Sequence, residues 1–209
     1  MTQQPIRIAL ALATLAMAGL SFCSQEDPQN SPLSEDCTFS YSQPTTSVHW
    51  TAFKYTEKAA VEGGFNQFQI QGTAPAKSQL DVFKNATFTI DVNSVDSGND
   101  GRDAKIKEHF FGHIEGSSLE GGIKSIEGNS GVMTLTMNGR TQEIPVELAV
   151  DGRKVILKGS LDVANFEGSE ALKALNEVCK ALHTGPDKVS KLWPDVNVRL
   201  ETSLDADCN

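Results

Sequence analysis

Apolar and polar residues alternate one by one along much of this chain. In one run, Ile144, Val146 and Leu148 occupy alternate positions, and Glu147 separates the last two. A period of two places the apolar side chains on one face of a β-strand and the polar ones on the other. Repeated along a chain, this pattern predicts antiparallel strands that cover a single core.

Short turn-forming segments divide the alternating pattern into eight predicted strands. Asn138-Gly139 and Asp151-Gly152 are two of these turns, and both dipeptides accept the positive φ of tight hairpins. Eight antiparallel strands in mostly hairpin order predict a mainly β fold, an up-and-down barrel with room for side chains or one small ligand. A two-sheet sandwich has the same signature and stays open. The predicted strands are Val48–Tyr55, Val61–Ile70, Ala86–Val95, Ser118–Glu127, Val132–Asn138, Thr141–Val150, Lys154–Val163 and Val196–Asp205.

Two short helices are predicted between the strands. The first covers Asp103–Phe111, with Asp103 as its N-cap, and the second covers Ser169–His183. Gly185-Pro186 ends the second helix, which we expect to lie across a mouth of the barrel. One face of that helix is apolar and carries Leu172, Leu175, Val178, Cys179 and Leu182.

The N-terminal residues are typical of an export signal. Ile8–Leu20 is apolar but too short to span a bilayer, which predicts a signal peptide over residues 1–22. Leu20-Ser21-Phe22-Cys23 resembles a lipobox, so we expect Cys23 to be lipidated and to anchor the protein in a membrane. Ordinary cleavage that leaves Cys23 a plain thiol is the alternative. Residues 23–36 are polar and acidic, which predicts a flexible tether before one domain over residues 37–209.

Charge and cysteine content restrict the partners and the location. The net charge of −9 becomes −10 when Arg7 leaves with the signal, which argues against nucleic acid and against docking on anionic lipid by charge. A small apolar molecule or a protein is the expected partner, and a homodimer stays open. Cys37 and Cys208 stand at the two ends of the domain. Because the first and last strands of a closed barrel are neighbours, we predict a Cys37–Cys208 disulfide, formed in an oxidising compartment.

Several segments together resemble the YceI family of bacterial polyisoprenoid-binding proteins. The similarity covers about residues 47 to 205 in the expected order. It implies an eight-stranded, lipocalin-like barrel with an apolar tunnel, in a periplasmic or outer-envelope protein. It also implies a polyprenyl chain, such as a quinone tail, as the ligand, and no other cofactor is expected. The segments are Trp50–Lys54, Val61–Phe65, Ile90–Ser94, Ser97–Phe111, Leu135–Gly139 and Gly159–Val163.

A tunnel for an isoprenoid needs apolar walls and few polar groups. Burial of each methylene group contributes about 0.8 kcal/mol, so several isoprene units bind without specific hydrogen bonds. For each wall candidate, the alternative is an ordinary core residue. The candidates are Phe53, Phe65, Phe88, Ile90, Phe111, Met133, Leu135, Met137, Leu161 and Trp193.

Catalytic chemistry is not expected. His109 and His113 have the spacing of two metal ligands on a helix, but no third ligand is evident, so neither a metal site nor a metal-dependent hydrolase is the favoured interpretation. Arg102 and Asp103 are expected to pin the preceding loop, with contact to a ligand headgroup as the alternative. Nucleophile elbows, P-loops and dinucleotide motifs are absent from the sequence. The leading hypothesis is therefore a lipid carrier or store, and a structural lipoprotein with a filled barrel is the second.

Overall fold

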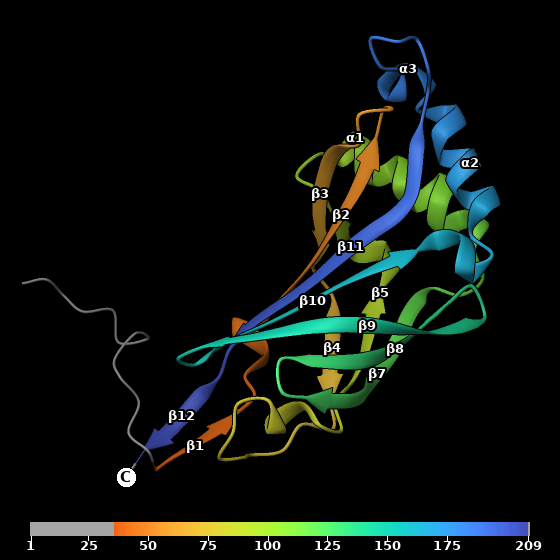
Figure 1. Cartoon of the computed structure of the whole chain (residues 1–209). Helices are drawn as coiled ribbons and strands as arrows, with labels where there is room; N and C mark the ends of the chain where they lie inside the picture. The colour runs from red at the N-terminus through yellow and green to blue at the C-terminus, as the bar shows by residue number, and fades with distance from the viewer. Residues whose placement is uncertain (1–35, 209) are drawn as a thin grey trace, which may run out of the picture.

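The computed structural model describes residues 36–208, which form one curled antiparallel sheet with a few helices on one side (Figure 1). The predicted signal peptide, Cys23 and nearly all of the predicted tether lie outside the described residues. Ten strands make up the curled sheet: β2 (Ser47–Lys54), β3 (Ala59–Phe65), β4 (Phe68–Gln71), β5 (Thr87–Asp91), β6 (Val95–Asp96), β7 (Ser118–Glu127), β8 (Ser130–Met137), β9 (Arg140–Asp151), β10 (Lys154–Asp162) and β11 (Leu192–Ser203).

The strand order across this sheet is β4-β5-β7-β8-β9-β10-β11-β2-β3-β6. Neighbouring strands from β7 to β11 are joined by successive connections, as the alternating pattern predicts. The fold is therefore mainly β and antiparallel, as expected, but the predicted count of eight strands is wrong for the described residues.

Two predicted strands are each divided, which raises the count to ten. The run Val61–Ile70 is divided between β3 and β4. The Asn66 amide still continues the pairing of β3 with β6 by donating to the Ser94 carbonyl (3.0 Å), and from Phe68 on the chain pairs with β5 instead. The run Ala86–Val95 is interrupted by a single helical turn, Val92–Ser94. The Asp91 side chain caps this turn by accepting from the Asn93 amide. Because β4 pairs with β5 and β3 pairs with β6, the two interruptions lie opposite each other.

The hairpin turns follow the prediction closely. Asn138 and Gly139 have φ values of 53° and 67°, and Gly152 has 55°, the conformations that the two dipeptides were expected to accept. Each turn joins neighbouring strands, β8 to β9 and β9 to β10. The dipeptides thus fix the register of three strands that carry much of the apolar interior.

A second, two-stranded sheet projects from one end of the molecule (Figure 1). It pairs β1 (Cys37–Ser40) with β12 (Asp205–Cys208), two short strands that sequence analysis missed, and Cys37 lies directly opposite Cys208. The predicted disulfide between these cysteines is confirmed. Its expected position is wrong, because it closes this small sheet rather than a seam of the curled one. Among the described cysteines, Cys179 is a buried free thiol.

The helical segments differ from the prediction in detail. The first comprises α1 (Asp100–Lys105), a π-helical turn (Ile106–Phe110) and a 3₁₀ turn (Phe111–His113). Its N-cap is Asn99, whose side chain accepts from the Arg102 amide, so the prediction of Asp103 as N-cap is wrong. The second predicted helix is divided into α2 (Ser169–Val178) and α3 (Lys180–His183). Figure 1 shows α2 beside the first helical segment at the upper end of the sheet.

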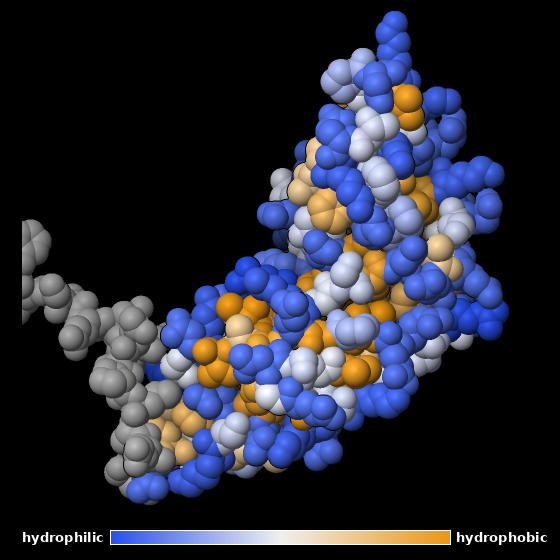
Figure 2. Space-filling model, in the orientation of Figure 1, coloured by the Kyte–Doolittle hydropathy of each residue, from blue (hydrophilic) through white to orange (hydrophobic). Residues whose placement is uncertain are grey.

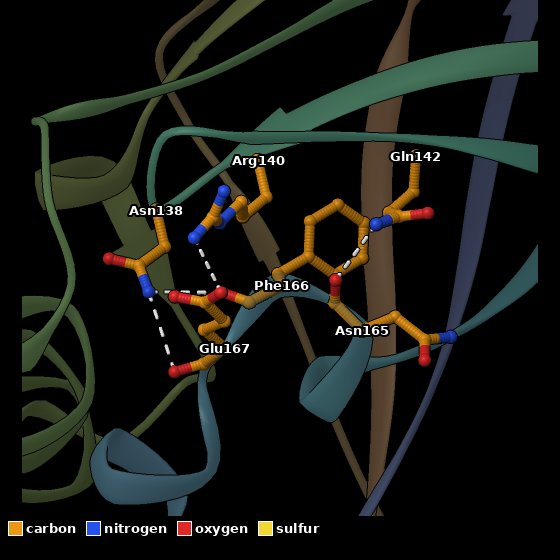
Figure 3. Close-up of polar contacts among 6 residues, drawn as sticks. All are labelled: Asn138, Arg140, Gln142, Asn165, Phe166 and Glu167. Carbon is orange, nitrogen blue, oxygen red and sulfur yellow. Dashed lines mark hydrogen bonds and ion pairs between the residues drawn. The ribbon is translucent and has the colours of Figure 1, made fainter.

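Polar contacts attach the β8–β9 hairpin to the turn Val163–Phe166 that follows β10 (Figure 3). The Asn138 amide nitrogen donates to the Phe166 carbonyl (2.9 Å), and Gln142 donates to the Asn165 carbonyl (2.9 Å). An ion pair between Arg140 and Glu167 (2.5 Å) adds a third link. These contacts hold the Phe166 ring, which is 0% exposed, in the core cluster that also contains Met133, Leu135 and Met137.

Candidate functional site

An apolar cavity of about 240 Å³ lies inside the curled sheet. Side chains from nearly every strand line it, together with Leu172 and Leu175 of α2. Among the described residues that line it, only His49, Thr87 and Arg199 bring a side-chain polar group other than an indole N–H. Such a space offers a guest dispersion contacts and removal from water, and almost no hydrogen bonds.

Both tryptophans of the chain line the cavity, and both have their indole N–H directed to the protein backbone. Trp50 Nε1 donates to the Gly64 carbonyl (3.3 Å), and Trp193 Nε1 donates to the Tyr55 carbonyl (2.6 Å). With these donors occupied, the rings contribute carbon surface to the wall. A Cβ at Gly63 would lie 2.3 Å from the Trp50 ring, so the indole needs a glycine at that position.

The cavity brings together nine of the ten predicted wall residues. Phe53 is the exception: it does not line the cavity, and its ring centroid lies 5.5 Å from Lys58 Nζ. Its neighbour Ala52 lines the cavity instead, as alternation along β2 requires. The nine are Phe65, Phe88, Ile90, Phe111, Met133, Leu135, Met137, Leu161 and Trp193.

Several lining residues were missed in the sequence. On β2 they are Val48, Trp50 and Ala52, whose period-two spacing places them together on the face opposite Phe53. Phe110, on the π-helical turn beside the predicted Phe111, also faces the cavity. Its ring packs edge-on against Phe111 with centroids 5.2 Å apart, a contact that depends on the helical geometry and not on spacing alone.

Apolar surface is also visible from outside. Figure 2 shows hydrophobic residues gathered along the middle of the viewed face, bordered by hydrophilic ones. Large exposed apolar residues include Val178 and Leu182, at 43% and 58% exposure. These two were expected on the buried face of one continuous helix. Instead, the helix is divided at Cys179, Val178 and Leu182 are exposed, and Leu172 and Leu175 line the cavity.

Arg102 and Asp103 pin the loop that precedes α1, as predicted. Asp103 is 6% exposed and accepts from the Ser97 amide (3.0 Å) and the Ser97 hydroxyl (2.5 Å). Arg102 Nε donates to the Ser97 hydroxyl oxygen (2.7 Å), and its terminal nitrogen donates to the Ser97 carbonyl (2.8 Å). Both charged groups are therefore engaged locally, and neither lines the cavity.

The histidines occupy varied surroundings. Within residues 36–208, no group of three or more His, Cys, Asp or Glu side chains is arranged to hold a metal ion, at His109 and His113 or elsewhere. His183 is half-buried, and its Nδ1 lies 2.9 Å from the Asn176 side-chain oxygen. Burial, together with the positive charges of Lys54 and Lys105, lowers the pKa of His183 to about 4. His183 is therefore neutral at pH 7 and belongs to the packing of α3.

The Cys37–Cys208 disulfide indicates an oxidising compartment, such as those outside the cytoplasm. In the described part of the chain, no helix is both long and apolar enough to cross a lipid bilayer.

Comparison with known proteins places this architecture. Among curated proteins, none matches the chain. The structure is similar to a polyisoprenoid-binding domain from Saccharophagus degradans, with a TM-score of 0.54 and 13% identity over 82% of this chain and 99% of that one. BcnA from Burkholderia cenocepacia gives a TM-score of 0.51 and 18% identity, over 80% and 99%. The YceI-like domain pattern matches residues 38–204, most of the chain. The protein therefore belongs to the YceI-like domain family.

Proposed function

We propose that this protein binds the apolar chain of an isoprenoid lipid in the cavity of its curled sheet, and carries or stores it without chemical change. The observation that carries the proposal is the cavity itself, whose wall is apolar except at His49, Thr87 and Arg199. Membership of the YceI-like family and the likeness to a polyisoprenoid-binding domain agree with it.

The wall suits a flexible hydrocarbon more than a rigid, polar substrate. Met133 and Met137 line it, and unbranched methionine side chains repack around guests of varied shape. Each buried methylene group of the guest contributes about 0.8 kcal/mol, so a chain of a few isoprene units reaches micromolar affinity after the cost of immobilisation. No group in the wall resembles a nucleophile with an adjacent base, so the proposal includes no catalysis.

A structural lipoprotein with a filled barrel is the competing function, and the cavity argues against it. A filled interior would leave no space beside the side chains, whereas this one leaves about 240 Å³. Native cores are packed at a density that leaves few voids larger than a water molecule. An empty apolar space of this size is costly for a purely structural protein, and a bound guest would offset that cost.

The proposed site of action is the cell envelope. The predicted signal peptide and lipidation of Cys23 would place the domain on a membrane, with the tether giving it reach. A lipid carrier needs such proximity, because its ligand resides in a bilayer. Metabolic labelling with a fatty-acid analogue, compared with a Cys23→Ser variant, tests the anchor separately from the cavity.

A substitution that fills the cavity tests the binding function. Ala52 lines the cavity from β2, so Ala52→Phe places a ring in the space proposed for the lipid. We expect organic extracts of the purified wild-type protein to contain an isoprenoid by mass spectrometry, and those of Ala52→Phe to contain at most a tenth as much. A tenfold difference in affinity corresponds to about 1.4 kcal/mol of binding free energy, or the burial of roughly two methylene groups of the lipid.

A matched control separates filling from misfolding. Ala60 is exposed on the neighbouring strand β3 and does not line the cavity, so Ala60→Phe adds the same ring outside. This variant should keep the wild-type lipid content. Extracts of native-host protein that repeatedly contain no lipid would refute the proposal, as would equal lipid content in the two variants when circular dichroism shows both folded.

A further inference from the structure

The wall of the curled sheet has a gap on one side. The strand β3 pairs with β2 only from His49 to Lys54, so Ser47 and Val48 have a strand neighbour on the β11 side alone. After Phe65 the chain bends away into β4, which pairs with β5 on one edge and, within residues 36–208, with no strand on the other. Between the start of β2 and the free edge of β4, the ladder is therefore missing.

A second pocket, of about 750 Å³, lies at this gap and adjoins the apolar cavity. The two spaces share wall residues, so the second pocket lies directly beside the inner cavity. The shared residues are Val48, His49, Trp50, Phe65, Phe68 and Arg199.

Hydrogen-bonding groups surround the outer pocket, in contrast to the inner cavity. Ser47, Thr51 and Asn66 contribute hydroxyl and amide groups, and His49 contributes a ring nitrogen. An amphiphile with its tail in the cavity would place its polar end among these groups. The lining thus changes from apolar in the inner cavity to polar in the outer pocket, as an amphiphile changes from its apolar tail to its polar head.

Charge in the outer pocket is unfavourable to an anion. Arg199 is the one lysine or arginine among the described residues that line it, and it is paired with Glu201, which also forms an ion pair with Lys154. Glu62 is exposed and has no recorded cation partner among the described residues. Asp96 accepts from the Asn66 amide nitrogen (2.9 Å) and the Gly98 amide (2.8 Å), which keep its pKa below the usual value, with a small contribution from the charge of Lys107.

From this arrangement we propose that the outer pocket receives the head of the bound isoprenoid and selects an uncharged, hydrogen-bonding head, such as an alcohol or a quinone, over a phosphate or diphosphate. The inference rests on the proposed isoprenoid function and extends it to the class of ligand. A diphosphate placed here would meet the carboxylates of Glu62 and Asp96, and the described lining offers no lysine or arginine that is not already paired with a carboxylate. Uncharged oxygen atoms would accept from the histidine, amide and hydroxyl groups and bring no charge.

Two ligands with the same tail test this selection: geranylgeraniol and geranylgeranyl diphosphate. Because both tryptophans line the cavity, intrinsic fluorescence reports tail entry for either ligand. We expect the alcohol to bind the delipidated full-length protein at least about tenfold more tightly at low salt, and the difference to shrink in 0.5 M NaCl, where charge repulsion is screened.

The two ligands differ in solubility, and measuring both on protein variants cancels that difference, because the ligands stay the same while the pocket changes. In a Glu62→Gln, Asp96→Asn double variant, the ratio of the two dissociation constants should fall by about threefold or more, because two repulsive charges are lost. Glu147→Gln provides the matched control, since Glu147 is an exposed carboxylate of β9 that lines neither cavity. This control should leave the ratio unchanged.

The possible outcomes are distinct. A diphosphate that binds as tightly as the alcohol, or a ratio that the double variant does not change, would overturn the selection while leaving tail binding in place. Failure of both ligands to bind would refute the isoprenoid function itself and the head selection with it. The double variant must retain its affinity for geranylgeraniol, which shows that its cavity is intact.

Discussion

Loss of the Cys37–Cys208 disulfide should lower the stability of the domain substantially and leave ligand binding nearly unchanged. The bond joins residues 171 positions apart, close to the whole domain. In the chain-entropy description, a loop of this length removes about 17 cal/mol/K from the unfolded ensemble, or about 5 kcal/mol at 25 °C. Residual structure in the unfolded chain reduces the effect, so we expect a loss of about 3–5 kcal/mol.

The location of the bond explains why binding should persist. Cys37 and Phe39 pack with Val82 and Leu204 in a core cluster at the projecting end, and none of these four lines the apolar cavity. The clamp thus acts mainly on the unfolded chain and on the small sheet. A Cys37→Ala, Cys208→Ser double variant should bind geranylgeraniol within about twofold of wild type, since an effect of less than about 0.5 kcal/mol is usual for a site outside the contact region.

Urea unfolding followed by circular dichroism measures the loss. The double variant should unfold at lower urea with a larger dependence on denaturant, because its unfolded chain exposes more surface without the crosslink. Cys179→Ala, which retains the disulfide and removes the buried free thiol, is the control for changes in cysteine number. A loss below about 1 kcal/mol would contradict the loop-length reasoning, and a large loss of affinity would show that the small sheet supports the cavity.

Three further substitutions probe the interior and the pH response. Phe166→Ala should lower the free energy of unfolding by about 3–5 kcal/mol, because the ring is fully buried. Leu182→Ala, at an exposed site, should change it by less than about 0.5 kcal/mol. Similar losses in the two variants would contradict the packing described. Gly63→Ala should cost about 1–3 kcal/mol and shift the Trp50 emission, because the added Cβ meets that ring; an unaltered spectrum would contradict this contact. The free energy of unfolding should decline as pH falls from 6.5 to about 4, because His183 takes up a proton more readily in the unfolded chain than in the folded one. The urea midpoint measured against pH should show this decline, and His183→Gln should weaken it. If the variant has the same pH dependence as the wild type, His183 is not the cause.

Alternation along the sequence was enough to locate the strands of the curled sheet. Ser118–Glu127 coincides with β7, and the Asn138-Gly139 turn lies between β8 and β9 as expected. Local chemistry determines these features, because a strand face and a tight turn each depend on a few adjacent residues. The nine wall residues that the cavity brings together follow from the same alternation and from the resemblance to the family.

Features that depend on distant pairing were not predictable in this way. The run Val61–Ile70 is divided because β3 pairs with β6 and β4 pairs with β5, and no local pattern marks this change of partner. The short strands β1 and β12 carry too few residues for a periodic signal and form only because they meet each other. Phe53 was predicted to line the cavity, but its position in the alternation of β2 places it outside.

The pairing of β2 with β11 has a consequence for biogenesis. Trp50 lies opposite Val198, so the first long strand of the sheet finds one of its two partners only near the end of the chain. Contacts between such remote segments form slowly, and apolar strands stay accessible to aggregation until they are made. If the predicted signal peptide directs export, the chain threads through a membrane channel before its last strand emerges. We therefore expect a nascent domain shortened before β11 to be unable to enclose a guest, and to depend on holding chaperones until translocation is complete.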